Sequence, residues 1–385
     1  MEVIALSIVF LLLSILGYAL DRKILNPLFI TPFLWGGLLF LYWAIPHPLY
    51  ALQEQFLYAI LIWVFSFFMG GLLFVNKKKF GSGDLYNKKV FNMYYYVVLV
   101  FAPMALITLV MEAIKVGPEM FFLRLRIINT GLDEDDSFSL GALGYVFNFT
   151  NVVCLLFTFY YEKLSKFKYY VVLFLAFLLG LITLARTSLV ALIIGIFVIL
   201  YFKKVLKKKH YFYFTGAFVA IMFMITMFRS FHEESSIEIA DTLAVYLLAG
   251  MPAFDTLVYY PTEDVGNYTF RFFYAVANAL GADYGVEKTI LSYAYVPMPT
   301  NVYTVMYPFF KDFGNIGVGI FGFTYGVIFV GIYKLKINPI GVILYALILP
   351  SLMLQFFGEY IYQNFSTYLQ YMIFLLAPYF LKTGR

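Results

Sequence analysis

The sequence predicts an all-α, polytopic integral membrane protein with about eleven transmembrane helices, and three observations lead to this prediction. Hydrophobic residues make up 63% and charged residues 13% of the 385 residues, whereas about 25% of residues are charged in soluble domains. Apolar runs long enough to cross a bilayer, which takes about 20 helical residues, recur along the whole chain. Lys and Arg gather in alternate connections between these runs. A soluble core does not accommodate this composition.

Each apolar run is expected to form one transmembrane helix. A single run could also be a buried helix of a soluble protein, but runs of this length repeat along the chain, and the length is the one needed to cross a bilayer. The chain is expected to form one transmembrane domain over residues 1–385. The expected spans are residues 3–20, 27–45, 56–75, 94–114, 141–160, 169–185, 187–202, 211–228, 313–333, 339–356 and 367–381.

The orientation follows from the cationic residues, because cytoplasmic loops collect Lys and Arg. Nineteen of the 27 lie in one set of alternate connections, which places the N-terminus outside and the C-terminus in the cytoplasm. The net charge of +5 is then a consequence of topology, so the basic loops require no nucleic-acid partner. The connections concerned are 21–26, 76–93, 161–168, 203–210, 334–338 and the C-terminal tail.

Two outer segments, 115–140 and 229–312, are too long to be simple turns, and long ordered loops tend to carry function. In the first, Gly117 and Pro118 are expected to open a helix at the membrane interface, which an acidic run closes at 133–136.

The larger outer segment has helical signals of its own. Ser235 and Glu238 match a capping box that begins an apolar periodicity, and Gly250 with Pro252 is expected to end it. A second short helix is expected over 268–280, with its stop at Gly281. Both helices are amphipathic, so this segment is expected to lie on the bundle as a lid.

Arginine and lysine are segregated across the membrane. Five of the seven Arg residues fall outside, whereas seventeen of the twenty Lys residues fall inside. Arg presents a planar fork that grips phosphate through two hydrogen bonds and tolerates partial desolvation. The sequence therefore predicts an anionic phosphate ligand at the outer surface, bound by some of Arg124, Arg126, Arg186, Arg229 and Arg271.

Arg186 is the strongest of these candidates, because it lies in the tight outer turn LARTS between two apolar spans. The alternative is a side chain that snorkels to the headgroups or caps the preceding helix. Arg229 could be an interfacial anchor instead. Arg124 and Arg126 are two apart, so both can grip one phosphate only on an extended segment, not on a helix.

The candidate general bases are Asp312, His232 and Glu233. Asp312 precedes Gly314 and a predicted span, so its alternative role is an N-cap. His232 is the one outer histidine near arginines, and the three histidines are scattered, so no metal site is expected. Asn301 and Tyr303, just before the ninth span, are candidate substrate contacts, although aromatic residues there also suit an interface belt.

The chain resembles the O-antigen polymerases, or oligosaccharide repeat-unit polymerases of the Wzy type. The resemblance rests on the Arg-Thr-Ser turn at 186–188, the large outer loop, and the passage PTNVYTVMYPFFKDFGNIGVG. It implies a glycosyltransferase of the bacterial inner membrane that joins lipid-linked repeat units on the periplasmic face, and it is compatible with a GT-C-like glycosyltransferase architecture. The donor would be a growing glycan on undecaprenyl pyrophosphate, and the acceptor a hydroxyl of the next lipid-linked unit.

Under this resemblance the arginines stabilise the departing pyrophosphate while a carboxylate or His232 removes the acceptor proton. Neither a cofactor nor a metal ion is expected, and a chain-length regulating co-polymerase is a possible partner beside membrane lipids. An O-antigen ligase uses the same donor and is the nearest alternative. A flippase or exporter of lipid-linked sugars would need polar residues along a central path, and the predicted spans hold few charges.

Overall fold

The structure is a computed structural model that describes residues 2–75, 84–117, 120–130, 138–183, 186–214, 216, 246–260, 264–286 and 291–383. Most of the expected span 211–228 and the helix expected to begin near Ser235 lie outside these residues. The chain forms two compact units, which we describe separately. Unit 1 comprises residues 1–79, 236–334 and 351–366, and unit 2 comprises residues 80–235, 335–350 and 367–385.

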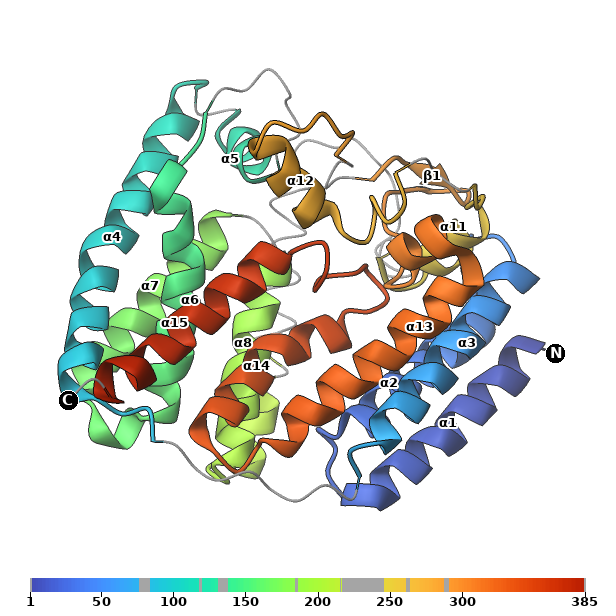
Figure 1. The fold of residues 1–385 in the computed structure, drawn as a ribbon, viewed down its shortest axis with the longest axis horizontal. Helices are drawn as coiled ribbons and strands as arrows, with labels where there is room; N and C mark the ends of the chain where they lie inside the picture. The colour runs from blue at the N-terminus through green and yellow to red at the C-terminus, as the bar shows by residue number, and fades with distance from the viewer. Residues whose placement is uncertain are drawn as a thin grey trace. The chain divides into compact units, whose positions relative to one another are not determined.

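The protein is an all-α polytopic membrane protein (Figure 1). Six helices are long and apolar enough to cross a membrane, and three shorter apolar helices accompany them among the described residues. Ten of the eleven expected spans coincide with a described helix. The one sheet in the described residues is a short antiparallel pair, β1 (Ala294–Tyr295) and β2 (Pro299–Thr300).

The helices of unit 1 are α1 (Glu2–Asp21), α2 (Pro27–Ala44), α3 (Glu54–Leu72), α11 (Gly250–Asp255), α12 (Arg271–Ala279) and α13 (Tyr307–Lys334). Those of unit 2 are α4 (Lys88–Ile114), α5 (Phe121–Thr130), η2 (Gly141–Gly144), α6 (Tyr145–Phe159), η3 (Tyr161–Lys163), α7 (Lys166–Ile182) and α8 (Arg186–Phe202). Helices α14 (Pro339–Met353) and α15 (Phe365–Thr383) each have residues in both units.

In unit 1, α1 pairs with α2, and α3 pairs with α13. The second pair is close because glycines face the neighbouring backbone. A Cβ on Gly70 would collide with the carbonyl oxygen of Phe323, and one on Gly326 would collide with that of Phe67. Small residues of this kind let helix backbones approach closely in a membrane, where burial of apolar surface from water does not drive helix association.

Helix α11 covers the N-terminal end of α3. Its last residue, Asp255, accepts hydrogen bonds from the main-chain N–H groups of Gln53 (2.8 Å) and Phe56 (2.7 Å). The Gln55 amide donates back to the carbonyl oxygens of Phe254 and Leu257, each at 2.9 Å. A carboxylate from another segment thus caps α3, where unpaired N–H groups favour an anion.

A turn separates α11 from the helical residues before it. Gly250 and Pro252 were expected to end a helix, and the helical residues 246–248 are followed by a turn at residue 249, after which a new helix, α11, begins at Gly250. Proline is tolerated in the first turn of a helix because its missing N–H has no partner there. Pro252 is therefore compatible with a helix that continues past it.

In unit 2, α4, α6, α7 and α8 pack together. The rings of Phe91 in α4 and Phe157 in α6 stack at 5.6 Å in the buried core. Helix α15 joins this bundle through polar contacts, since Tyr94 donates to the carbonyl oxygen of Phe374 (2.8 Å) and Asn148 donates to Gln370 (2.8 Å).

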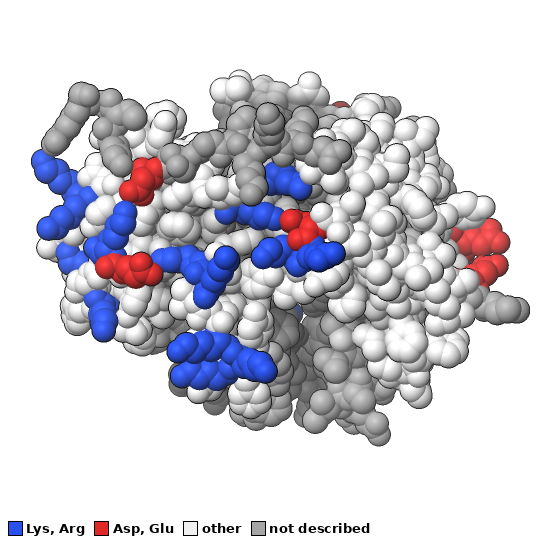
Figure 2. All heavy atoms as spheres, turned by 90° about the horizontal axis from the view of Figure 1, so that it is seen from below, with Lys and Arg blue, Asp and Glu red and all other residues white. Residues whose placement is uncertain are grey.

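Ten of the lysines of unit 2 lie at one end of its bundle, where α4 and α7 begin and α6 and α8 end, whereas Lys115 follows the other end of α4. Figure 2 shows Lys and Arg side chains gathered on this face with few Asp and Glu among them. The alternation of charge expected from the sequence therefore corresponds to one end of the helices in this unit. The lysines concerned are Lys88, Lys89, Lys163, Lys166, Lys168, Lys203, Lys204, Lys207, Lys208 and Lys209.

Candidate functional site

At the opposite end of unit 2, the short helix α5 presents Arg124 and Arg126. It is anchored by Leu125, which is 2% exposed and packs against Leu109 and Ala113 of α4. Because the chain is helical here, the two arginines point about 200° apart and cannot both grip one phosphate. The sequence left this choice open, and the helix decides it.

Arg124 is directed to a carboxylate that the sequence analysis did not single out. Its Nη2 lies 3.3 Å from Oε1 of Glu112, and Lys115 pairs with the other oxygen of the same group. The side chains of Arg124 and Glu112 are only 16% and 13% exposed. One carboxylate therefore holds two cations at this corner, which leaves the local balance of described side chains positive.

The same hydrophobic cluster connects α5 to the end of α7, shortly before Arg186 in the sequence. Ile182, the last residue of α7, packs against the cluster that contains Leu125, and Arg186 is the first residue of α8. Arginines from two separate segments thus belong to one end of unit 2. The side chain of Arg186 and the whole of Arg229, His232 and Glu233 lie outside the described residues.

Asp312 belongs to unit 1 and does not cap its own helix. Helix α13 begins at Tyr307, six residues before the expected span, and its backbone is interrupted at Gly314 (φ 59°). The Asp312 carboxylate, 6% exposed, instead accepts from the main-chain N–H groups of Tyr268 (3.2 Å) and Thr269 (2.6 Å). The expected N-cap is therefore wrong, and the carboxylate fixes a different segment.

That segment leads directly into α12, whose first residue is Arg271. The expected helix over 268–280 is present as α12, and Gly281, with φ 101°, follows its end. Arg271 is half-buried. Asp312 holds the backbone at Thr269, two residues earlier, and so helps to fix where α12 begins in space. Two candidate residues are therefore connected within unit 1: Arg271 begins the short helix α12, and the Asp312 carboxylate anchors the backbone just before this helix.

Replacing Asp312 with Asn separates an anchoring role from catalysis. The amide NH₂ would face a main-chain N–H, and a buried donor without an acceptor costs about 1–3 kcal/mol. We expect a lower melting temperature with activity per folded molecule within about tenfold of the native protein. If Asp312 were also the general base, activity per folded molecule would fall by about 10²–10⁴ in addition to the change in melting temperature.

Tyr303 and Asn301 lie in the segment just before α13. Tyr303 is 4% exposed, its hydroxyl donates to the carbonyl oxygen of Ser292 (3.0 Å), and its ring lies 5.0 Å from that of Tyr307. Asn301 is half-buried. The segment is also bonded to the chain that follows α14, because the N–H of Val305 donates to the carbonyl oxygen of Gln355 (2.7 Å).

Gln355 begins a buried polar cluster that the sequence analysis missed. Its side chain is fully buried, and Oε1 accepts from the indole N–H groups of Trp35 (3.2 Å) and Trp63 (2.8 Å). Its amide donates to Thr31 (3.2 Å). Trp35 and Trp63 lie near the middle of α2 and α3, so Gln355 lies near the mid-depth of these spans. Irregular backbone is tolerated at that depth only where protein or a water-filled cavity surrounds it.

Glu359 lies a few residues further along the same irregular segment and is 3% exposed. Its Oε1 accepts from the Tyr325 hydroxyl and from the N–H groups of Ile361 (2.7 Å) and Tyr362 (2.9 Å). Its Oε2 accepts from the N–H of Gln363 (2.8 Å). Tyr325 lies midway between Gly314 and the end of α13, so this carboxylate is also deep.

The sequence held a signal for this cluster. Gln355 falls inside an expected span, and Glu359 follows it closely. Polar and ionisable residues are costly in the hydrocarbon region, so those that occur there tend to face the protein interior and to carry function. What the sequence did not show is that α14 ends at Met353 and that the chain continues, without helix, among α2, α3 and α13.

Comparison with known proteins identifies one family. A family model described as O-antigen polysaccharide polymerase Wzy matches residues 2–260, more than half of the chain. The matched residues include α5, Arg186 and α11. No curated protein and no solved structure matches the chain.

Proposed function

Because this chain belongs to the O-antigen polysaccharide polymerase Wzy family, we propose that it joins oligosaccharide repeat units carried on undecaprenyl pyrophosphate into O-antigen or a related surface polysaccharide. At the level of the family, it is a multi-pass membrane protein of polysaccharide biosynthesis. The lipid carrier, the arginine contacts and the periplasmic position of the reaction are our proposal.

The reaction is a displacement at the anomeric carbon of the donor glycan. A hydroxyl oxygen of the acceptor unit bonds to this carbon, the bond from the carbon to the pyrophosphate oxygen breaks, and the acceptor proton passes to a base. The leaving group takes up negative charge as the bond breaks, so cations already in place stabilise the transition state more than the ground state. We assign this role first to Arg186, with Arg124 or Arg126 beside it.

One observation supports this assignment most directly. Leu125 of α5 and Ile182 at the end of α7 belong to one hydrophobic cluster, so arginines from two outer segments share one end of unit 2. That end is opposite the group of ten lysines, as a ligand at the outer headgroups requires. Helix α8 also directs its N-terminal N–H groups, which favour anions, to the same end.

The acceptor proton requires a base, for which His232, Glu233 and Asp312 are the candidates. Of these, Asp312 already accepts two main-chain hydrogen bonds, and such bonds stabilise the charged carboxylate and weaken it as a base. We therefore favour His232 or Glu233, which follow Arg229 closely in the sequence.

The experiment that tests this function incubates purified protein in detergent or nanodiscs with a synthetic undecaprenyl-pyrophosphate-linked repeat unit. We expect a ladder of products that differ by one repeat unit, equally in the presence of EDTA. A single transfer to a different lipid would identify a ligase. Movement of unreacted substrate across vesicles, with no new glycosidic bond, would identify a transporter.

A further inference from the structure

The lysine-rich end of unit 2 contains a pocket that the polymerase reaction does not use. Its volume is about 300 Å³, and it lies among the ends of helices that are distant in the sequence. The segment before α4, the end of α6, the residue after α8 and the first residue of α14 all contribute to its wall. The lining residues are Asp84, Phe159, Tyr160, Glu162, Lys163, Lys203 and Pro339.

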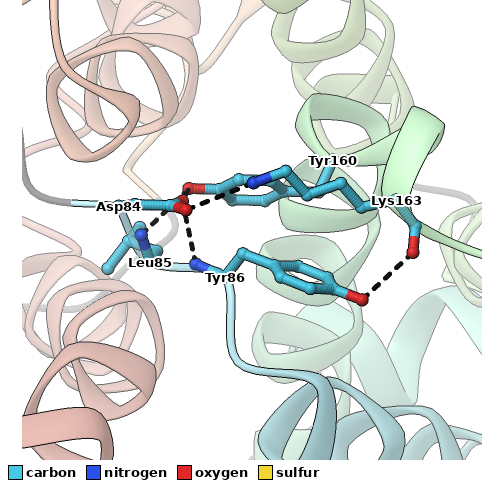
Figure 3. A network of polar contacts seen from close by, with 5 residues as sticks. All are labelled: Asp84, Leu85, Tyr86, Tyr160 and Lys163. Atoms are coloured by element: carbon cyan, nitrogen blue, oxygen red, sulfur yellow. Dashed lines mark hydrogen bonds and ion pairs between the residues drawn. The ribbon is translucent and has the colours of Figure 1, made fainter.

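One wall of the pocket is a fixed polar network (Figure 3). Asp84 accepts from the Tyr160 hydroxyl (2.7 Å), and Lys163 lies 3.2 Å from its other oxygen. The N–H of Leu85 donates to the Tyr160 hydroxyl (3.0 Å), and Tyr86 donates to the carbonyl oxygen of Lys163 (3.0 Å). These bonds hold the chain before α4 against the end of α6.

The network persists at neutral pH. Burial acts to raise the pKa of the Asp84 carboxyl, but hydrogen bonds from Tyr160, Tyr86 and Lys163, with the charge of Lys163, outweigh burial and lower the pKa below its usual value. A depressed pKa means that the stabilisation is present above the usual carboxyl range and is lost only as the pH falls through the lowered value. The wall is therefore preformed when a ligand arrives.

The two lysines of the pocket still have N–H groups for a ligand. Lys163 gives one hydrogen bond to Asp84. Lys203 donates to the carbonyl oxygen of Phe159 (2.8 Å) and lies 3.3 Å from Glu162, whose side chain is 75% exposed. An ammonium group has three N–H donors, so each lysine can make a further bond. At Lys203 an anion would compete with an exposed, weak ion pair to Glu162, and at Lys163 it would share the ammonium group with Asp84.

The surroundings favour an anion that belongs to the membrane. Ten lysines and two carboxylates, Asp84 and Glu162, lie at this end in the described residues of unit 2. Phe159 and Pro339 give the pocket an apolar side beside its charges. Basic pockets between helices on the lysine-rich side of a membrane protein suit anionic lipid headgroups, with the apolar wall next to the glycerol and the first acyl carbons.

We propose that this pocket binds the phosphodiester headgroup of an anionic phospholipid from the leaflet on the lysine-rich side, with Lys163 and Lys203 as its direct contacts. This leaflet is opposite the one in which we place the pyrophosphate substrate. The bound lipid would bridge the ends of α4, α6, α8 and α14 and so hold this end of the bundle together. The proposal does not depend on the polymerase reaction.

The test measures lipid retention by the full chain. Purified protein is equilibrated with phosphatidylglycerol or phosphatidylcholine in mixed micelles, and bound lipid is counted by native mass spectrometry. We expect the native protein to prefer phosphatidylglycerol. We assign about fivefold in binding to each lysine that contacts the bound headgroup directly, so the variant Lys163→Gln/Lys203→Gln should lose about 25-fold.

Two further variants keep the test decisive. Lys208→Gln/Lys209→Gln removes the same charge from exposed side chains that do not line the pocket, and we expect it to lose less than fivefold. Glu162→Gln removes the acid that competes for Lys203, so retention of phosphatidylglycerol should rise. A pocket variant that retains as much phosphatidylglycerol as the exposed-lysine variant overturns the proposal, as does retention that Glu162→Gln leaves unchanged.

Inorganic phosphate and glycerol phosphate distinguish a lipid from a soluble ligand. Each is added at millimolar concentration to protein loaded with phosphatidylglycerol. Because the acyl chains contribute to binding, we expect neither to displace the lipid. Displacement by glycerol phosphate would show that the pocket recognises a soluble phosphate ester and would contradict the assignment to a membrane lipid.

Discussion

An Arg186→Ala protein is expected to lose about 10²- to 10³-fold in the rate of repeat-unit joining, the usual effect of removing one electrostatic contact to a developing charge. Arg186 is the first residue of α8, so its backbone position is set by this helix. The loss should appear in the maximal rate more than in the apparent affinity, because the leaving pyrophosphate gains its charge in the transition state. Single-turnover measurements with the synthetic donor check this.

Two variants control the interpretation. Arg186→Lys keeps the charge but not the planar fork, so we expect activity between that of Ala and that of the native protein. Lys23→Ala removes a cation from the connection 21–26, which the sequence predicts to be cytoplasmic, and should leave the rate unchanged. An Arg186→Ala protein that is normally folded and polymerises at the native rate would remove the basis of the proposed mechanism.

A Glu359→Ala protein is expected to be destabilised by about 3 kcal/mol or more, which is a large part of the stability of a typical domain. The substitution leaves three main-chain N–H groups and the Tyr325 hydroxyl without their acceptor in a buried site. Each buried donor that loses its partner costs about 1–3 kcal/mol, and these costs do not add fully. Thermal melting in detergent and the yield of folded protein measure the effect.

The loss of stability should increase with the number of hydrogen bonds that a substitution removes. Tyr325→Phe removes one donor and leaves the three main-chain bonds, so we expect a cost of about 1 kcal/mol. Glu162→Ala removes an exposed carboxylate and should change the stability by less than about 0.5 kcal/mol. Equal melting temperatures for Glu359→Ala and Glu162→Ala would contradict the anchoring role of Glu359.

The spans of this protein could be predicted from its sequence because each depends on a local property, the length of an apolar run. The ends of the helices were less predictable. The ninth span was expected to begin at 313, yet α13 begins at Tyr307, because Phe309 and Phe310 are buried in its first turns and the break comes later, at Gly314. Hydropathy does not show that a helix is interrupted and then resumes.

The candidate site was also predictable only in part: the sequence shows which residues it contains but not which groups they contact. The segregation of arginine from lysine is visible in the sequence, because it depends only on composition and alternation. The partners of these residues are not visible. Arg124 meets Glu112 from another helix, and Asp312 binds the backbone more than forty residues away instead of its own helix. Gln355 was included in an expected helix because hydropathy cannot show that the indole N–H groups of two tryptophans donate to its side-chain oxygen.

The contact between α3 and α13 limits what selection can change in this protein. At Gly70 and Gly326 even the single methyl group of alanine would meet a carbonyl oxygen of the facing helix. Backbone atoms cannot rotate away as a side chain can, so the two helices would have to separate along their length. A laboratory-evolution experiment aimed at new sugar preferences should therefore leave both positions invariant and recover its useful variants in the outer connections.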